Sequence, residues 1–424
     1  MTDRPAIRLI SAAGVADAAG VCASPGALLI ECGSAVRVLA VGTPRQVASH
    51  PAAGSAERVD RPDAVLIPGL VNAHTHLDLT SVGPRAYDRK NGFSAWLSMV
   101  MRHRATDPQD IHRAVGEGVA RSLAGGVVAV GDIAGTGRLE PAEALGASRL
   151  VGVSFVEYFG NGGVPDGIRS MAAGRVRVGV QPHAPYSAGP DLYRAALASG
   201  LPLSTHLAES MAERELLTRG TGPMRAFLES IGVWNDVVAA RFGGGARGGA
   251  ARTSVAYLRE FIGSGEPIVM AHVNDADDAD IELLARSRCS VVYCPRSHEY
   301  FGNDAELGPH RYRDMIDAGI NVALGTDSII NVPEDESHRL STLDEMRLLR
   351  ERDGTDPGLL LRMATVNGAR ALGLDASLFE FSAGEIAGVA AVGVRGTDPT
   401  LDPLTRVMKG GRGGGVELLA GATP

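Results

Sequence analysis

Histidines stand at the ends of several short apolar runs in this sequence. His74 and His76 end the run that begins at Leu70, and later runs end in a further polar set: His183, His206, His272 and Asp327. Two histidines at positions i and i+2 of a strand point the same way, so both imidazoles can reach one ion. A third imidazole and a carboxylate would complete a set of three nitrogens and one oxygen, which is typical of a catalytic zinc site with an open position for water. We therefore predict a divalent metal site formed from these residues.

Glu209 follows His206 by three residues. This spacing places a carboxylate just beyond a candidate ligand, where a proton from water must be handled during hydrolysis. The alternative is a glutamate at the start of a helix beginning near Ser210, where it would interact with the helix dipole. Beside the other polar residues, we favour the role in proton transfer.

Residues this far apart in the sequence need a scaffold that brings them together. From about residue 68 onward, apolar runs of four to eight residues alternate with helical stretches of ten to fifteen, a pattern typical of βα units. We expect eight strands: Leu70–Ala73, Val127–Asp132, Leu150–Val156, Val176–Pro182, Leu201–Thr205, Pro267–Ala271, Ser290–Tyr293 and Asn321–Gly325. The carboxyl ends of parallel strands in a barrel share one face, so the polar strand ends would meet in one pocket.

Helices are expected between these strands. Asp107 and Pro108 form a cap and first-turn pair, and apolar residues with helical spacing follow there and in two further segments, Asp277–Arg286 and Thr342–Arg350. Eight parallel strands with helices between them predict an α/β protein built as a closed (β/α)₈ TIM-like barrel. An open, doubly wound sheet is the alternative.

The two chain ends have a different pattern. Residues 1–67 and 378–424 contain short strands separated by turns and glycines. We expect both ends to form one small β-sandwich domain beside a metal-dependent hydrolase barrel of residues 68–377. The glycine-rich segment 243–249, between the fifth and sixth predicted strands, is expected to be a flexible insertion that can act as a lid.

The composition narrows the class of partner. The formal net charge of −8 gives no electrostatic footprint for nucleic acid or for an anionic membrane. No stretch approaches the ~20 uncharged apolar residues of a membrane span, and the N-terminus carries charges where a signal peptide needs an apolar core. The four cysteines are too scattered for a disulfide framework. We expect a cytoplasmic protein, a homodimer in the plainest case, that acts on a small molecule.

Five blocks together resemble the amidohydrolase superfamily, in its branch of cytosine deaminases, adenosine-type deaminases and chlorohydrolases. They are Pro68–His76, Pro182–Ser187, His206–Glu209, Ala271–His272 and Leu324–Ser328. The blocks follow one another in the family's order and span the whole predicted barrel. Within the branch, the sequence is most similar to aminodeoxyfutalosine deaminase-like proteins, through weaker signals that include Phe93, Trp96 and Cys294–His298.

The resemblance implies a role for each matching residue. One ion, Zn²⁺ or Fe²⁺, would be held by His74, His76, His206 and Asp327. Glu209 would carry a proton from the activated water to a ring nitrogen, His272 would orient and polarise that water, and Asp327 would accept its proton. The substrate, an N-heterocyclic small molecule, would be contacted by His183, Phe93, Trp96, Arg296, His298 and Ser328.

Lysine is nearly absent, which bears on the number of metal ions. Only Lys90 and Lys409 occur in the chain. Superfamily members with two metals bridge them with a carboxylated lysine at the end of the fourth strand, where this sequence has Gln181–His183. The resemblance thus implies a single ion, with zinc as the first choice.

The activity that the resemblance implies is hydrolytic deamination of an aminated purine-like heterocycle or nucleoside, of the aminodeoxyfutalosine or adenosine type. Metal-activated hydroxide would attack an amidine carbon and ammonia would leave. Two alternatives stay open. The protein could remove another leaving group, chloride or alkylamine, from a nitrogen heterocycle, or it could be a catalytically silent metal-binding homologue.

Overall fold

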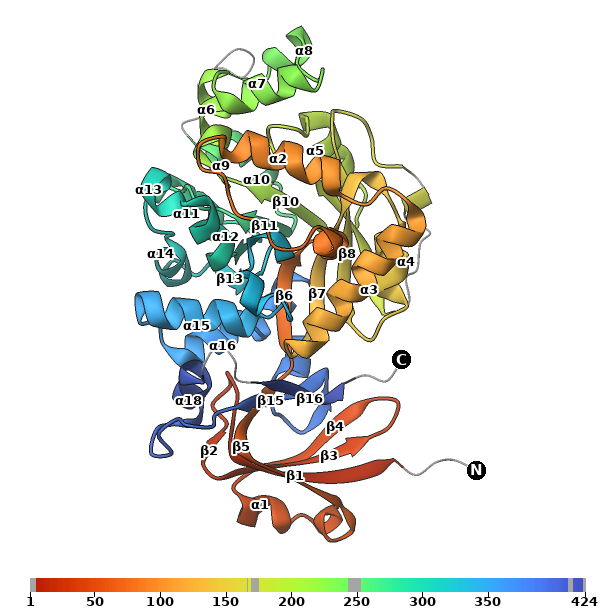
Figure 1. Ribbon diagram of the computed structural model, residues 1–424, viewed down its shortest axis with the longest axis vertical. Coiled ribbons are helices and arrows are strands. Elements are labelled where there is room, and N and C mark those ends of the chain that lie inside the picture. Colours follow the sequence, from red (N-terminus) through yellow and green to blue (C-terminus); the bar gives the residue numbers. More distant parts are fainter. Residues whose placement is uncertain (1–4, 166, 169–174, 243–252, 411–414, 422–424) are drawn as a thin grey trace.

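The computed structural model describes residues 5–165, 167–168, 175–242, 253–410 and 415–421. These residues form a nearly closed parallel barrel and, below it in Figure 1, a second sheet built from both chain ends. The predicted lid segment 243–249 lies outside the described residues. No described helix is long and apolar enough to cross a membrane.

The barrel sheet has eight parallel strands that lie side by side in chain order, from β6 to β13. The predicted strands are confirmed, and their ends agree to within two residues. The observed strands are β6 (Leu70–Thr75), β7 (Val127–Ala134), β8 (Val151–Tyr158), β9 (Val176–Pro182), β10 (Leu203–Leu207), β11 (Ile268–His272), β12 (Ser290–Tyr293) and β13 (Asn321–Leu324). Their residues are nearly all buried, because a parallel sheet is covered on both faces, which explains why they read as continuous apolar runs.

The first and last strands meet just beyond the end of β13. Thr75 and Asp327 form an isolated parallel bridge. The Asp327 amide donates to the His74 carbonyl oxygen at 3.1 Å, and the His76 amide donates to the Asp327 carbonyl oxygen at 2.9 Å. The backbone that closes the barrel therefore also places a carboxylate beside two imidazoles.

Helices cover the outside of the barrel (Figure 1). Helix α3 begins as predicted, because the Asp107 side chain accepts the amides of Gln109 and Asp110 and Pro108 fills the first turn. Asp277 likewise caps α11. The helices between β6 and β10 are α2 (Gly92–His103), α3 (Pro108–Ala124), α4 (Glu140–Gly146) and α5 (Pro190–Ala198).

Most of the later helices span nine residues or fewer, and α15 is the exception with 12. Between β10 and β11 lie α6 (Met211–Arg219), α7 (Pro223–Ser230), α8 (Asp236–Ala239), α9 (Ser254–Tyr257) and α10 (Arg259–Ile262). Beyond β11 follow α11 (Asp278–Ala285), α12 (Pro295–Phe301), α13 (Asn303–Leu307), α14 (Tyr312–Asp317), α15 (Thr342–Asp353), α16 (Pro357–Met363) and α17 (Val366–Ala371). Two 3₁₀ turns matter for the site, η2 (Leu77–Val82) and η3 (Gly135–Gly137).

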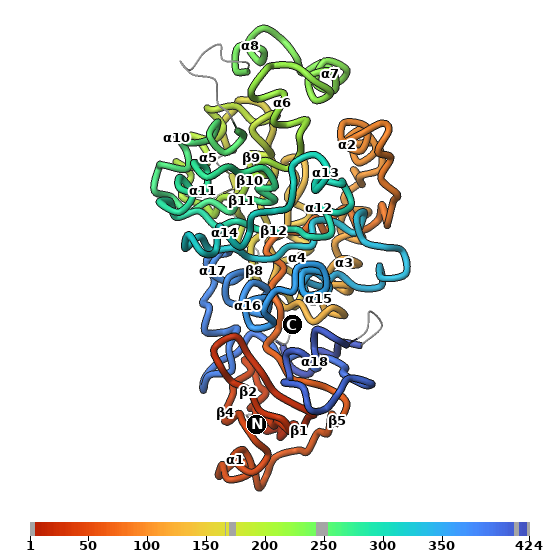
Figure 2. Tube along the Cα trace, turned by 90° about the vertical axis from the view of Figure 1, so that its left-hand side faces the viewer, coloured from red at the N-terminus to blue at the C-terminus, as the bar shows by residue number. Residues whose placement is uncertain are grey.

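The second sheet joins both chain ends, as the sequence predicts. Its strand order is β14-β4-β3-β1-β5-β15-β16, with β2 paired to β1, and it curls around its own apolar core (Figure 2). Its strands are β1 (Ala6–Ala16), β2 (Cys22–Ala23), β3 (Gly26–Cys32), β4 (Val36–Gly42), β5 (Glu57–Pro68), β14 (Gly384–Ile386), β15 (Gly388–Gly393) and β16 (Val416–Gly421). The short helices α1 (Pro44–Ala48) and α18 (Pro403–Lys409) accompany it.

One glycine links the two sheets. Strand β5 runs to Pro68 and β6 begins at Leu70, so Gly69 alone lies between them. Its amide donates to the Gly388 carbonyl oxygen at 2.8 Å. A Cβ on Gly69 would lie 2.6 Å from the Cγ2 atom of Val128, closer than packed carbon atoms allow. Only a residue without a side chain fits this passage from one sheet to the other.

Candidate metal centre and active site

The predicted ligands come together at the carboxyl ends of the barrel strands. His76 Nε2 and His206 Nε2 are 3.2 Å apart, and Asp327 Oδ1 lies 3.6 Å from His76 Nε2 and 3.8 Å from His74 Nε2. Two overlapping groups, His74 with His76 and His206 and His74 with His272 and Asp327, each hold their ligand atoms within 4.8 Å of one another. All five side chains are buried. The four predicted ligands and His272 therefore share one centre.

The imidazoles of this centre suit a cation. Burial first, and then the neighbouring imidazoles, hold the pKa values of His74 and His76 well below their ordinary value, and burial lowers the pKa of His206 to about 4. The rings are therefore neutral and carry free lone pairs. Neither ring nitrogen of His74 has a hydrogen-bond partner among the described residues. Converging lone pairs without donors fit a divalent ion, which supplies the missing positive charge.

His206 is oriented by its other ring nitrogen. Its Nδ1 lies 3.0 Å from the carbonyl oxygen of His183 and 3.0 Å from the side-chain nitrogen of Gln181. When Nε2 binds a metal ion, the ring carries its proton on Nδ1 and donates it to the carbonyl oxygen. Nε2 is then the unprotonated atom that faces His76. A ligand histidine that donates its second N–H to a carbonyl is the usual arrangement around a protein metal ion, because it fixes both tautomer and ring orientation.

The backbone is strained where these side chains leave it. Ala208, His272, Val273 and Asp327 have φ values of 53°, 72°, 52° and 58°. Residues other than glycine seldom adopt this left-handed region, and such strain persists only where the surroundings enforce it. The strain lies just beyond the ends of β10 and β13 and at the end of β11, where it turns the chain into the centre.

Glu209 is buried beside His272, with 3.6 Å between its Oε1 and the His272 Nε2. Its backbone is held on both sides: Glu213 accepts the amides of Ala208 and Glu209 at 2.9 and 3.0 Å, while Asn274 donates to the Glu209 carbonyl oxygen. Burial, and then the charge of Asp327, raises the pKa of Glu209 well above its ordinary value. This carboxyl therefore holds a proton more readily than an exposed glutamate does.

The two carboxylate oxygens of Asp327 contact different groups. Oδ1 faces His74 and His76, and Oδ2 accepts a hydrogen bond from the Ser297 hydroxyl at 2.8 Å. Burial raises the pKa of Asp327 to about 6. The carboxylate can thus face an ion while remaining a plausible acceptor for a proton from water.

His183 lies at the edge of the centre and is partly exposed. Its Nδ1 is 2.5 Å from the Ser187 hydroxyl oxygen, and its ring centroid is 4.7 Å from that of Phe159. Phe159 is 46% exposed, unusual for a phenylalanine. The pair presents aromatic surface at the mouth of the barrel.

Phe93 and Trp96 lie on α2 in an aromatic cluster. Their rings stack at 5.7 Å, and both meet Phe301 of α12 edge to face. Phe93 is buried and Trp96 is half-buried. The Trp96 indole N–H interacts with the Tyr300 hydroxyl, so this cluster offers a ligand its aromatic surface.

Two further predicted substrate contacts, His298 and Ser328, are already engaged with protein groups. His298 faces Asn274 through Nδ1 at 3.1 Å and Asp304 through Nε2 at 2.8 Å. Ser328 is buried, with its hydroxyl 3.2 Å from the Asn331 Oδ1. Their positions as substrate contacts stay a prediction.

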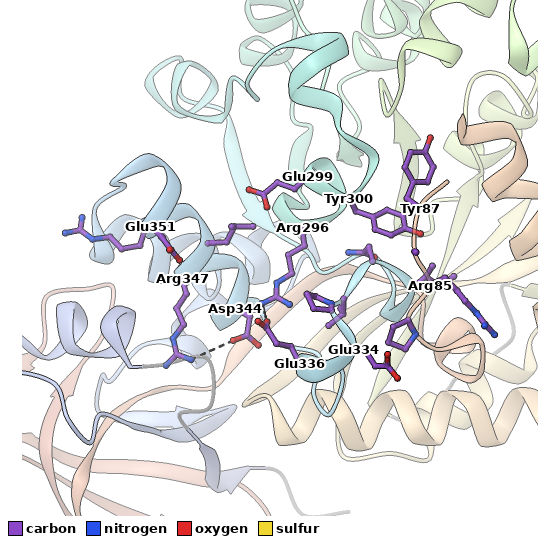
Figure 3. Close-up of a pocket in the computed structure, with 18 of the residues that line it drawn as sticks. Arg85, Tyr87, Arg296, Glu299, Tyr300, Glu334, Glu336, Asp344, Arg347 and Glu351 are labelled. Atoms are coloured by element: carbon purple, nitrogen blue, oxygen red, sulfur yellow. Dashed lines mark hydrogen bonds and ion pairs between the residues drawn. The ribbon is translucent and has the colours of Figure 1, made fainter. Parts of the chain in front are cut away.

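Arg296 lines a separate cavity of about 960 Å³. It forms ion pairs with Glu336 and Glu345, and Figure 3 shows it extended toward Glu336. Tyr87 and Tyr300 line the other side, and the predicted metal ligands are not among the lining residues. The large cavity therefore adjoins the centre through α12 without containing it.

Sequence reasoning missed a buried charged group beneath the histidines, formed by Asp78, Arg104, Asp132 and Glu157. Asp132 and Glu157 occur near the carboxyl ends of β7 and β8, the position that identified the ligands, so this signal could have found them. Nothing in the sequence distinguishes Arg104 from the other arginines near α2.

Known proteins were compared with this chain. Residues 65–417 match the amidohydrolase family. An aminodeoxyfutalosine deaminase of Deinococcus radiodurans is 30% identical over 341 residues, which cover 74% of this chain and 75% of that protein. A 5-methylthioadenosine/S-adenosylhomocysteine deaminase of Syntrophobacter fumaroxidans is 27% identical over 413 residues, covering 92% and 85%.

The fold is also shared with a solved structure. The crystal structure of atrazine chlorohydrolase from Arthrobacter aurescens TC1, complexed with zinc, has a TM-score of 0.67 and 20% identity, covering 98% of this chain and 95% of that one. Identity at this level shows a common fold alone. The sequence match over most of the length is more specific, and by that match the chain belongs to the amidohydrolase family.

Proposed function

We propose that this protein is a zinc-dependent deaminase that hydrolyses an aminated purine-like heterocycle or nucleoside and releases ammonia. Membership of the amidohydrolase family makes it a hydrolase of carbon–nitrogen bonds. One observation carries the finer proposal: Glu209 and His272 lie 3.6 Å apart beside the cluster of His74, His76, His206 and Asp327. The relatives named above are deaminases of purine nucleosides by their names, which supports this substrate class.

The residues divide the chemistry between them. A divalent ion at the cluster would supply a water whose pKa lies near ~7. Asp327 can accept a proton from that water, since its Oδ1 faces the ligand imidazoles. His272, which is buried and neutral, can orient the water by a hydrogen bond.

Glu209 is the group that moves a proton to the substrate. Its raised pKa lets it carry one proton of the attacking water to a ring nitrogen of the amidine, while the second, accepted by Asp327, goes to the departing amine. Its fixed backbone keeps the carboxyl beside His272 during both transfers. His183, Phe93 and Trp96 offer aromatic surface for the substrate ring. The remaining predicted contacts to the substrate are Arg296, His298 and Ser328.

We propose a single zinc ion, with Fe²⁺ as the alternative. The donor set of three imidazoles and one carboxylate is typical of a mononuclear catalytic site. Strand β9 ends in Gln181 and Pro182, where a bridging lysine would have to stand. The zinc in the chlorohydrolase of the same fold supports the choice of metal.

The test combines metal analysis with a substrate screen on one preparation. We expect about one equivalent of zinc or iron and ammonia release from one of a panel: aminodeoxyfutalosine, adenosine, 5′-methylthioadenosine and S-adenosylhomocysteine, with cytosine and atrazine as comparison substrates. Chloride release from atrazine without ammonia from any nucleoside would contradict deamination and favour the chlorohydrolase alternative. A metal-loaded protein inactive on every compound would favour the silent homologue.

We also propose that the protein acts in the cytoplasm as a homodimer that binds neither nucleic acid nor membrane. Its four cysteines are free thiols, and two of them, Cys289 and Cys294, are buried, which suits a reducing compartment. Two-fold dimers are the commonest assembly of soluble enzymes. Light scattering at micromolar concentration measures the mass in solution, and a monomer mass would contradict the dimer.

A further inference from the structure

A buried arginine clamps two carboxylates beneath the metal centre. Arg104, just after α2, donates to Asp78 through Nε at 2.7 Å and through Nη2 at 3.2 Å, and it reaches Glu157 through Nη1 at 3.4 Å. Asp78 and Glu157 are both buried, and the side chain of Arg104 is nearly so. Charge-assisted pairs of this kind, removed from water, hold their members in one geometry.

The space for this arginine is shaped by a glycine. A Cβ built on Gly135 would lie 1.9 Å from the Arg104 Cζ, which means that the guanidinium occupies the place where a side chain would begin. Gly135 belongs to η3 at the end of β7. The substitution Gly135→Ala would therefore displace Arg104 while removing no charge and no hydrogen-bonding group.

The clamp holds only one oxygen of Glu157. The other, Oε1, lies 3.7 Å from His183 Nε2 and 4.0 Å from His206 Nδ1, and it is buried without a hydrogen-bond partner among the described residues. A buried carboxylate oxygen without a donor is costly, so its position toward two imidazoles needs a reason.

A second cation between these groups is the competing explanation. Glu157, His183 and His206 do hold ligand atoms within 4.8 Å of one another. However, when His206 binds the first ion through Nε2, its Nδ1 carries the proton and donates it to the His183 carbonyl oxygen, 3.0 Å away. A protonated nitrogen cannot coordinate a metal, so the group lacks its third ligand.

We propose that Glu157, fixed by Arg104, is a positioning residue that sets the tautomer and orientation of His183. The Arg104 guanidinium favours the ionised form of Glu157, and in that form Oε1 favours a proton on the facing Nε2. The Ser187 hydroxyl then donates to Nδ1 at 2.5 Å in preference to the Ala184 carbonyl oxygen at 3.3 Å. The ring is held at both nitrogens and packs against the exposed Phe159. His183 would accordingly meet the substrate with its ring surface, so the site selects a flat, aromatic group at this position.

The contact of His183 with the substrate rests on the proposed function. The tautomer of His183 can be measured without any substrate. In metal-loaded protein labelled with ¹⁵N-histidine, we expect the His183 signals, assigned with His183→Gln, to show a proton on Nε2. Glu157→Gln and Gly135→Ala should shift His183 toward the other tautomer or a mixture. Gly116→Ala, on an open part of α3, is the matched control and should leave the signals unchanged.

Kinetics and metal content complete the test. We expect both variants to keep one metal equivalent, while kcat/KM falls by about 10-fold to 100-fold, mostly through KM. Two equivalents in the parent protein, with one lost in Glu157→Gln, would overturn the proposal in favour of a second metal. A His183 tautomer unchanged in Glu157→Gln would also overturn it. If Gly135→Ala fails to fold, Glu157→Gln still decides the matter, and an inactive parent protein leaves the tautomer result valid.

Discussion

At the scale of residues, the centre holds more buried acidic groups than the neighbouring positive charge of the protein can neutralise. Several buried carboxyls, those of Asp78, Asp132, Glu157, Glu209 and Asp327, surround neutral imidazoles, and Arg104 is the cation beside them. Burial raises the pKa of Asp132 to about 7, and the same cause acts on Glu157. The positive charge of a bound divalent ion would stabilise the ionised form of these carboxyl groups. The same charge would activate a bound water molecule.

Glu209→Gln tests the proton transfer. The amide keeps the size of the side chain but cannot exchange a proton, so we expect kcat to fall by ~10² or more while one metal equivalent is retained. Glu282→Gln, exposed on α11, is the control and should keep the activity of the parent protein. Activity retained in Glu209→Gln would remove this residue from the mechanism.

Zinc affinity should depend on pH in a defined way. Metal binding needs Asp327 as a carboxylate, and its pKa in the folded, metal-free protein is about 6, above the ordinary value of 3.8. Protons therefore compete with zinc as the pH falls through 6. The pKa of His206 is about 4, so this imidazole stays available until much lower pH. We expect the logarithm of the zinc affinity to fall by about one per pH unit between 6 and 4, as one proton is taken up. A competition titration with a chelator measures this slope, and a flat profile would contradict it.

At the scale of elements, α6 connects a helix cap to the active site. Ser210 caps α6 by accepting the amide of Glu213, and Glu213 in turn accepts the amides of Ala208 and Glu209. The start of this helix therefore fixes the segment that carries Glu209, the proposed catalytic carboxyl. The sequence indicates a helix beginning near Ser210, but the hydrogen bonds to Glu213 become visible only in three dimensions.

Ser210→Ala should reduce both stability and activity. Loss of the cap costs ~1 kcal/mol, and the freed Glu213 would hold Glu209 less firmly, so kcat should also fall. Asp356→Ala removes the cap of α16, where the side chain accepts the Leu359 amide at 2.9 Å, and serves as the matched control. Urea denaturation and kinetics on both variants should show similar losses of stability, with a loss of kcat in Ser210→Ala alone. Equal kcat values would contradict the link.

Much of the barrel could be predicted because its strands are buried on both faces. β9 and β12 agree with the sequence prediction at both ends, since valines recur along each strand and a turn or helix follows it. The sequence does not single out the long strand β1, since its burial is interrupted and its parallel partner β5 is distant in the chain. Arg104 could not be predicted for a similar reason: its role depends on the packing of Gly135 against it.

At the scale of the whole molecule, the barrel and the curled sheet share one continuous stretch of chain through Gly69. We expect Gly69→Ala to lower the free energy of unfolding by ~1–3 kcal/mol, because the new methyl group would collide with the stiff side chain of Val128. Gly54→Ala, where open space surrounds the added carbon, is the control. Urea denaturation monitored by circular dichroism measures both, and equal midpoints would contradict the crowding argument.

The bridge between Thr75 and Asp327 has a consequence for the dynamics of the molecule. The backbone of Asp327 joins the first strand to the last, and its side chain faces the imidazoles of the proposed metal site. Metal binding should then stabilise the contact between the first and last strands. Hydrogen exchange should slow more at the amides of His76 and Asp327 than at the amides of β9 and β10, on the opposite side of the barrel. Removal of the ion with a chelator would weaken the junction between β6 and the residues after β13, and would leave β9 and β10 unchanged.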